Sequence, residues 1–270
     1  MRLYDAHNHL QDPRLGPDVS PLVAQAAQEG VVRMVVNGSC EEDWPDVLAL
    51  ARKHAEVIPS FGCHPWYVKE RTPHWRDVLT RALDEVPSAI GEIGLDRWIK
   101  DYDLPAQEEV FVWQLRLAAE RDLPVSIHCL QAWGRLLELL EANPCPGCGF
   151  LLHSYGGPPE MIPALAKLGA YFSLPGCFAH ERKERQRETF RHVPPDRLLI
   201  ETDAPDQLLP DERNRHPLTD PSSGKPINHP ANLRAVHDFA AELLGEPVEP
   251  LAIRVGENFQ RLFGHFLSAP

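Results

Sequence analysis

Long apolar segments and an excess of positive charge are both missing from this sequence. No apolar run approaches the ~20 residues that cross a bilayer, and the opening MRLYDAHNH lacks the apolar core of a signal peptide. We therefore expect a cytoplasmic protein that does not bind membranes. The net charge is −12 at pH 7, which argues against sequence-independent binding along a nucleic acid through a basic surface. Phosphate groups can still be bound through metal ions, because the ions are then the largest local charges.

Motifs of covalent catalysis and of structural zinc binding are also missing. Cys145 and Cys148 form a lone C-x-x-C without a second pair, and we interpret this segment as a turn. The six cysteines lie mostly in or beside apolar segments, as small buried hydrophobes do. No Ser-His-Asp arrangement is evident, and Cys129 should point away from the strand face that carries His128, its neighbour. The sequence thus favours chemistry that needs no side-chain nucleophile.

Short apolar runs alternate with longer segments of helical spacing, and no linker or low-complexity segment divides them. The expected strands cover residues 3–8, 31–38, 57–64, 88–95, 124–129, 149–154, 170–176 and 197–205. The expected helices lie near residues 19–29, 43–54, 74–86, 105–122, 131–142, 158–168, 181–191, 230–244 and 249–263. Eight strands alternating with helices are typical of an α/β fold, the (β/α)8 TIM barrel, here as a single domain over residues 1–270. A doubly wound parallel sheet is the alternative.

Two further segments follow late strands of this pattern. Residues 205–230 form a long irregular stretch after the last strand, and we expect it at the C-terminal ends of the strands, where TIM barrels have their active sites. The basic segment HERKERQRETFRH, residues 180–192, begins just past the seventh strand and could lean over that site. We favour a solvated helix with ion pairs such as Glu181–Arg185.

Residues of metal-binding types gather at the C-terminal ends of the expected strands. They are His7, His9, His64, Glu92, His128, His153 and Asp203. His7 and His9 are two residues apart, so in a strand they share one face and can bind one ion. Because all of these strand ends meet at the catalytic rim of a barrel, we predict a metal site there. We interpret the remaining histidines of helix-like or polar segments as surface or packing residues: His54, His74, His192, His237 and His265.

The types of these side chains narrow the choice of metal. Imidazole and carboxylate groups suit Zn²⁺, Mn²⁺, Fe²⁺ or Ni²⁺ better than Mg²⁺ or Ca²⁺, which prefer oxygen, although Mg²⁺ stays among the candidates. Six ligands are too many for one tetrahedral ion and fit two ions that share a carboxylate. The predicted ligands are His7, His9, Glu92, His128, His153 and Asp203. Glu92 is the natural bridge, because its strand lies between the two ends of the ligand set.

Two more carboxylates are predicted beneath the metal site. Asp5 precedes His7 by two residues and Glu201 precedes Asp203 by two, so both should face the barrel lumen one layer below. There they could fix the tautomers of the ligands. The alternative is a pair of buried polar groups that neighbouring layers satisfy.

Several motifs together resemble one known family. DAHNHL resembles an opening H-x-H, GCHP a G-x-H-P, and GEIGLD the most recognisable segment of the TatD-like metal-dependent deoxyribonucleases, which belong to the amidohydrolase-like barrels. IHC and HSYGG match the two later histidine strands, ETDAP the last motif, and GENFQRLF the C-terminal helix. Each motif is weakly specific, but their order and spacing make the resemblance strong over nearly the whole chain.

The resemblance implies a TIM barrel that binds two divalent metal ions and hydrolyses phosphodiester bonds in DNA. One ion would be held by His7, His9, Glu92 and Asp203, and the other by Glu92, His128 and His153. It also implies that His64 reaches toward a substrate phosphate. In the corresponding mechanism Asp203 orients the attacking water and acts as general base, while the metals and His64 stabilise charge on the phosphoryl oxygens.

The sequence departs from the family at groups that would contact phosphate. Leu130 and Gln131 stand where relatives commonly have an arginine and an acidic residue, Asp206 replaces an aromatic residue, and PGCFAH lacks a lysine. A missing arginine forfeits a bidentate phosphate contact, and a carboxylate near the mouth would repel an anion. These changes favour the alternative function, hydrolysis of a carboxylic ester, amide or lactone, including aminoacyl-tRNA deacylation. Because the ligand set is unbroken, a non-enzymatic barrel is disfavoured.

Overall fold

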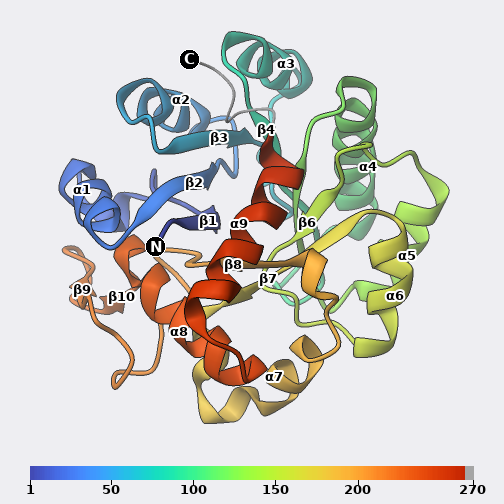
Figure 1. The fold of residues 1–270 in the computed structure, drawn as a ribbon. Helices are drawn as coiled ribbons and strands as arrows, with labels where there is room; N and C mark the ends of the chain where they lie inside the picture. The colour runs from blue at the N-terminus through green and yellow to red at the C-terminus, as the bar shows by residue number, and fades with distance from the viewer. Residues whose placement is uncertain (265–270) are drawn as a thin grey trace.

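Eight parallel strands form one sheet in the computed structural model, which describes residues 1–264 (Figure 1). The strands are β1 (Leu3–Asn8), β2 (Val31–Asn37), β3 (Val57–Phe61), β4 (Ala89–Asp96), β5 (Val125–Leu130), β6 (Phe150–Leu152), β7 (Ala170–Pro175) and β8 (Leu198–Glu201). Each strand pairs in parallel with the next one along the chain. This sequential order confirms the predicted (β/α)8 TIM barrel and excludes a doubly wound sheet, whose strand order reverses.

Helices connect the strands and surround the barrel (Figure 1). They are α1 (Ser20–Gln28), α2 (Trp44–Lys53), α3 (Trp75–Glu85), α4 (Leu104–Arg121), α5 (Trp133–Ala142), α6 (Ile162–Lys167), α7 (Glu184–Phe190), α8 (Leu233–Leu244) and α9 (Val248–Phe263). All but α6, which begins four residues later than expected, agree with the expected helices to within three residues. Because helices cover the outside and side chains fill the inside, nearly every strand residue is buried. None of the helices in the described part of the chain has the length and apolarity of a membrane span.

Three segments differ from the sequence-based expectation. The expected helices 158–168 and 181–191 each begin as a 3-10 turn and continue as the short α6 and α7. The irregular segment 205–230 contains a small hairpin of β9 (Leu218–Thr219) and β10 (Pro226–Ile227). Prolines explain the break before α6, because Pro158, Pro159 and Pro163 lack the N–H groups of a regular helix. Of the histidines expected on the surface or in packing, His265 lies outside the described residues.

The barrel closes where its first strand meets its last. The backbone N–H of Asp203 donates to the His7 carbonyl at 2.9 Å, and the N–H of His9 donates to the Ala204 carbonyl at 2.8 Å. The fully buried Asp5 carboxylate accepts hydrogen bonds from the backbone N–H of Thr202 at 2.9 Å and from its hydroxyl at 2.5 Å. Asp5 therefore connects β1 to the end of β8.

The structure supports the alternative given for Asp5, a buried polar group satisfied by its neighbours, and the predicted role in fixing the tautomer of a ligand is wrong. Its side chain contacts Thr202 and Asn8, and the ring of His7 instead contacts Ser126. The period-2 rule correctly predicted that Asp5 is buried, but a carboxylate binds whichever donors lie nearest, and those belong to β8 and its loop.

The C-terminal helix packs against the same pair of strands from the other end. Tyr4 of β1 and Phe259 of α9 have ring centroids 4.9 Å apart, and the Asn258 amide donates to the Leu198 carbonyl at the start of β8 at 2.9 Å. In Figure 1, α9 crosses in front of the barrel in red. The junction of β1 with β8 is thus held at both ends.

Replacing Asp5 with Ala should lower the free energy of unfolding by about 2–4 kcal/mol, because two buried donors of Thr202 would lose their acceptor. Urea unfolding followed by circular dichroism measures this change. Glu120→Ala, which removes an exposed carboxylate of α4, is the control and should cost less than ~0.5 kcal/mol. Equal losses in the two variants would contradict a role of Asp5 in closing the barrel.

Candidate metal centre

The seven side chains predicted at the rim lie together at the C-terminal ends of the strands. Only Glu92 and His128 lie well inside their strands, whereas His64 follows the end of β3 by three residues and Asp203 follows β8 by two. Six of the seven line one cavity of about 620 Å³, and His7 lies buried beneath it. Of the strands that carry these residues, β3, β6 and β8 end two to four residues earlier than expected, so His64, His153 and Asp203 lie on the loops that follow them.

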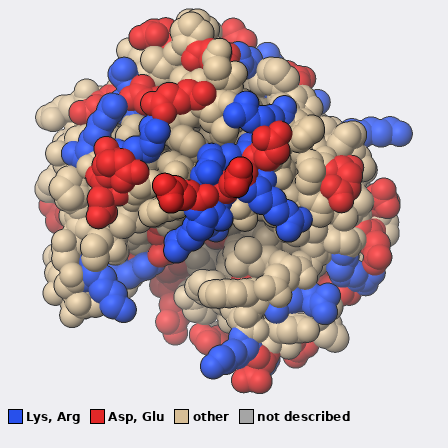
Figure 2. All heavy atoms as spheres, turned by 90° about the horizontal axis from the view of Figure 1, so that it is seen from below, with Lys and Arg blue, Asp and Glu red and all other residues tan. Residues whose placement is uncertain are grey.

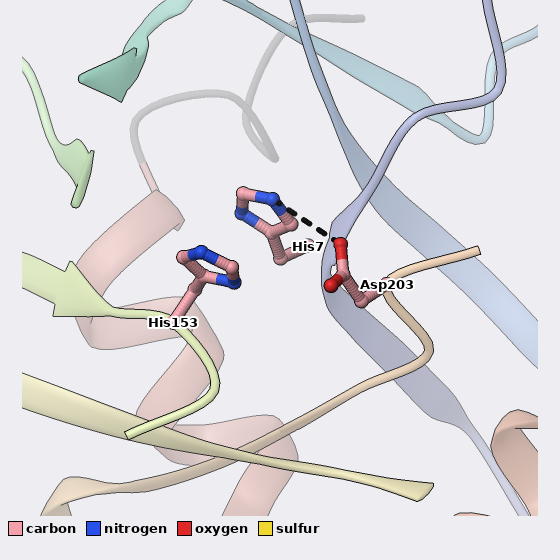
Figure 3. A group of neighbouring side chains, drawn as sticks. All are labelled: His7, His153 and Asp203. Carbon is pink, nitrogen blue, oxygen red and sulfur yellow. Dashed lines mark ion pairs between the residues drawn. The ribbon is translucent and has the colours of Figure 1, made fainter. Parts of the chain in front are cut away.

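One oxygen of Glu92 faces the two histidines of β1 and its loop. Its Oε2 lies 3.4 Å from His7 Nε2 and 3.2 Å from His9 Nε2, and the two nitrogens are 3.2 Å apart. Asp203 Oδ1 approaches the same nitrogens at 3.7 and 3.5 Å. Figure 3 shows the Asp203 carboxylate beside the ring of His7. Two imidazoles and two carboxylates therefore converge on one point.

The other oxygen of Glu92 faces the later histidines. Its Oε1 lies 3.0 Å from His128 Nδ1 and 2.8 Å from His153 Nε2, and these nitrogens are 3.1 Å apart. The rings of His7 and His153 stack with their centroids 4.1 Å apart, so the two groups of ligand atoms are adjacent (Figure 3). Glu92 thus has one oxygen in each group, as a bridging carboxylate requires.

His9 and His128 each form a hydrogen bond through the ring nitrogen that points away from the site. The other ring nitrogen of each residue then faces Glu92. His9 Nδ1 donates to the Asn37 carbonyl at 2.8 Å, and His128 Nε2 donates to Asp96 Oδ2 at 3.0 Å. In the neutral rings, the nitrogens that face Glu92 then carry no hydrogen. Lone pairs of nitrogen beside carboxylate oxygens repel one another unless a proton or a metal ion lies between them, and although burial opposes it, Glu92 raises the pKa of His9 to about 9. The donor set therefore fits divalent metal ions, and three overlapping groups of side chains are close enough to hold one.

Burial and mutual charge shift the protonation of this cluster in opposite directions. Burial alone would raise the pKa of Glu92, but His153, His64 and His7 hold it well below its usual value. Burial lowers the pKa of His7 to about 4. Burial raises the pKa of Asp203, despite the nearby His153 and His9. The cluster thus combines a carboxylate that stays charged with one that holds a proton more firmly.

His64 differs from His9 and His128 in which ring nitrogen faces the site, because its inward nitrogen carries the hydrogen. The backbone N–H of Trp66 donates to His64 Nδ1 at 3.2 Å, so the neutral ring carries its hydrogen on Nε2. That nitrogen faces the cavity and lies 3.4 Å from Glu92 Oε1. In this tautomer His64 can donate a hydrogen bond into the site, and its position with Glu92 and His128 is also close enough to hold an ion.

Sequence reasoning missed Asp96, which supports His128 from behind. Its four close donors occupy both carboxylate oxygens: Trp66 Nε1 and His128 Nε2 on Oδ2, and the backbone N–H groups of Trp98 and Ile99 on Oδ1. These bonds lower the pKa of Asp96 to about 2 although burial opposes them. Asp96 lies four residues after Glu92 on β4, so the period-2 rule could have found it.

Close approach of β4 to β5 places His128 against Asp96 and Glu92. A Cβ at Gly94 would lie 2.0 Å from the His128 carbonyl oxygen, a distance that no side chain tolerates. Only glycine therefore fits at this position of the GEIGLD segment. On the far side, Glu201 lies 3.7 Å from His153 Nδ1 and accepts hydrogen bonds from Ser154 and Ser173, which agrees with its predicted place beneath the site.

The mouth of the cavity corrects one expectation about charge. Asp206 was expected to present a free carboxylate, but its two oxygens accept hydrogen bonds from the Arg14 guanidinium at 2.9 and 2.8 Å. Leu130 lines the cavity and is exposed, as are Trp66 and Trp98. Trp133 is not among the lining residues and instead packs edge-on against Tyr155, with centroids 4.6 Å apart.

The basic segment 180–192 does not contribute to the lining of this cavity in the described structure. Its Arg187 donates to the carbonyls of Phe178 and His180, and an ion pair of this segment joins Glu188 to Arg191. The expected Glu181–Arg185 pair does not form within residues 1–264. The cysteines are free thiols, and Cys148 lies in a turn as predicted.

Comparison with known proteins places these observations in context. The family model described as TatD related DNase matches residues 4–264. The chain is 32% identical over 271 residues to the 3'-5' ssDNA/RNA exonuclease TatD of Escherichia coli K12, covering 97% of this chain and 99% of that protein. It is 29% identical over 265 residues to the uncharacterized metal-dependent hydrolase YjjV of the same strain, covering 97% and 98%. The crystal structure of YjjV, a TatD homolog, superposes with a TM-score of 0.87 at 28% identity, over 97% of this chain and 98% of that chain.

Replacing Asp96 with Asn should weaken metal binding about 10- to 100-fold, because an amide has only one acceptor atom for donors that now occupy two. In either orientation its NH₂ group would face two donors. Competition with a chelator, read by elemental analysis of the protein, measures the affinity. Asp101→Asn in the neighbouring loop is the control, and metal binding by Asp96→Asn that matches it would contradict the supporting role.

Proposed function

The chain belongs to the TatD related DNase family, and on that premise we propose that it is a single-domain, metal-dependent phosphodiesterase that hydrolyses DNA. The observation that carries this proposal is the position of Glu92, whose two oxygens each face a separate group of imidazole nitrogens. Such an arrangement is suited to two divalent ions that share one carboxylate. Family membership identifies the reaction class, and the cluster supplies the groups it needs.

Each ion would be held by a separate group of residues. The first group is His7, His9, Glu92 and Asp203, and the second is Glu92, His128 and His153. Imidazole and carboxylate ligands favour Zn²⁺, Mn²⁺, Fe²⁺ or Ni²⁺, and Mg²⁺ stays a candidate. When bound, such ions polarise a phosphoryl oxygen and lower the pKa of water, which supplies a nucleophile at neutral pH.

Asp203 is proposed as the general base. Its carboxylate is buried, lies within 3.7 Å of His7 Nε2, and has a pKa that burial raises, so it can take up the proton of the attacking water. The residue adopts a left-handed conformation with φ of 51° two residues after β8, and its backbone N–H donates to the His7 carbonyl. This turn fixes the carboxylate at the edge of the cluster, beside open cavity.

His64 is proposed to bind the phosphate during reaction. With its hydrogen on Nε2, the ring can donate to a phosphoryl oxygen as negative charge develops there. A neutral donor suits this role because burial lowers the pKa of His64 to about 4, so the ring stays neutral at pH 7 and its tautomer is set by Trp66.

We expect this cavity to accept the unpaired end of a nucleic acid strand rather than a long duplex. A relative is named a 3'-5' ssDNA/RNA exonuclease, and the exposed indoles of Trp66 and Trp98 at the mouth offer surfaces on which unpaired bases can stack. The face that includes α7 shows basic and acidic side chains interleaved (Figure 2). This face therefore offers no continuous basic stripe for a nucleic-acid backbone.

A second function is favoured by the scarcity of cations at the mouth. Leu130 lines the cavity at the position where the family resemblance implies an arginine, and carboxylates such as Glu42 and Asp206 line it as well. A carboxylic ester, amide or lactone, including the ester of an aminoacyl-tRNA, would need fewer phosphate contacts at the reacting bond. The same metal cluster would serve either reaction.

The first test is cleavage of an end-labelled single-stranded DNA by the purified protein with Mn²⁺, Mg²⁺ or chelator. We expect metal-dependent cleavage, and Glu92→Gln should lower kcat/KM at least about 10³-fold because one shared carboxylate charge is lost. Glu120→Gln is the matched control. Metal-loaded protein that cleaves no DNA but hydrolyses a carboxylic ester would overturn the nuclease assignment in favour of the second function.

Replacing His64 with Ala distinguishes between two roles of this residue, a hydrogen-bond donor to phosphate and a metal ligand. As a donor, His64 contributes only to reaction, so kcat should fall about 10²-fold while the metal content stays that of the wild type. Elemental analysis and single-strand cleavage on the same sample measure both quantities. Loss of one equivalent of metal would instead make His64 a ligand.

A further inference from the structure

Arg14 is the single Lys or Arg among the described residues that line the metal cavity. The same lining carries carboxylates outside the metal cluster, namely Asp12, Glu42, Asp43, Asp46 and Asp206. A substrate with several phosphate groups therefore finds only one cationic side chain outside the metal cluster, Arg14, among those of residues 1–264 that line this cavity. Whether that cation is free to bind phosphate decides much of the affinity for an oligonucleotide.

Arg14 is held by two carboxylates on adjacent edges of its guanidinium, which share the Nη2 group. Asp12 accepts hydrogen bonds from its Nε at 3.0 Å and from its Nη2 at 2.7 Å. Asp206, on the loop after β8, accepts from Nη1 at 2.9 Å and from Nη2 at 2.8 Å. Asp12 also accepts the backbone N–H of Arg14 at 2.8 Å, which fixes the turn of residues Pro13–Leu15.

The two carboxylates differ in how readily they can be displaced. Asp12 is local in sequence, makes a backbone contact as well, and has a side chain only 20% exposed. Asp206 comes from a different loop and is 57% exposed. Exposed ion pairs contribute little to stability, so an arriving anion can replace Asp206 at small cost. After such an exchange Asp12 would still point Arg14 at the mouth.

We propose that Arg14 binds a phosphate of the oligonucleotide next to the one being cleaved, and that Asp206 competes with this phosphate for the guanidinium. The proposal rests on the nuclease function proposed above. A carboxylate and a phosphate bind an arginine through the same pair of N–H donors. Asp206 therefore occupies the donors of Arg14 that a phosphate would use. Asp206 thus limits affinity for polyanions, and Arg14 supplies the cation that Leu130 does not.

Substitutions of Arg14 and of Asp206 should change KM in opposite directions if Asp206 competes with phosphate. They should change it in the same direction if the pair only holds two loops together. The Arg14–Asp206 pair also ties the loop after β1 to the loop after β8. If it served only to hold these loops, removing either partner would weaken substrate binding. Under competition, Arg14→Ala raises KM for single-stranded DNA about tenfold, whereas Asp206→Asn lowers it about three- to tenfold.

The experiment measures KM by cleavage of an end-labelled oligothymidylate and Kd by anisotropy of a fluorescein-labelled phosphorothioate oligothymidylate, both with metal-loaded protein. Variants are Arg14→Ala, Asp206→Asn and the double substitution, and Glu42→Gln is the control that removes another carboxylate of the lining. The gain from Asp206→Asn should vanish in the Arg14→Ala background and exceed the gain from Glu42→Gln. The slope of log Kd against log salt should fall by about 0.7 in Arg14→Ala, as for one phosphate contact on a single strand.

Three other results would overturn the inference. They are weaker binding in both single variants, equal gains in Asp206→Asn with and without Arg14, and unchanged affinity in Arg14→Ala. The binding measurement does not depend on cleavage. Wild-type protein that binds DNA through Arg14 but does not hydrolyse it would therefore refute the nuclease function alone, and cleavage unaffected by Arg14 would refute this inference alone.

Discussion

The position of the Glu92 carboxylate between two groups of imidazole nitrogens is the constraint on which the rest of the structure depends. Its two oxygens must each lie close to 3 Å from nitrogens that come from β1, β5 and the ends of β3 and β6. Six strands contribute to this cluster, and parallel order is what brings their C-terminal ends to one rim. A small shift of any strand would separate a ligand atom from Glu92, so the register of the barrel is also the geometry of the site.

Buried carboxylates in this protein fall into two kinds. Asp5, Asp96 and Glu201 each accept hydrogen bonds from hydroxyl, indole or backbone N–H groups, and such bonds offset much of the cost of burying a charge. Glu92 and Asp203 have no such donors to their side chains within residues 1–264 and face histidines instead. Carboxylates of the first kind connect segments of the barrel to one another. Those of the second kind need a cation to balance their charge. This contrast identifies the reactive pair without reference to any relative.

Sequence reasoning succeeded wherever a residue's role follows from its place on one strand. The strand ends predicted His7, His9, Glu92, His128, His153 and Asp203 as one cluster, and alternation predicted burial of Asp5 and Glu201. It failed where a role depends on partners from other segments. Asp5 contacts Thr202 rather than the ring of His7, and Arg14 meets Asp206 across 192 residues of sequence. Neither partner can be read from local spacing, because each contact is created by the closure of the barrel.

Closure of the barrel also determines when the residues of the metal cluster can come together during folding. His7 and His9 belong to the first strand made, whereas Asp203 follows the eighth and reaches His7 only when the two ends of the sheet join. A nascent chain that has emerged as far as β5 carries Glu92 and four of the five histidines but not its proposed general base. A fragment that ends before β8 therefore lacks Asp203 and cannot complete the cluster, so the metal centre forms only after the last strand has joined the first.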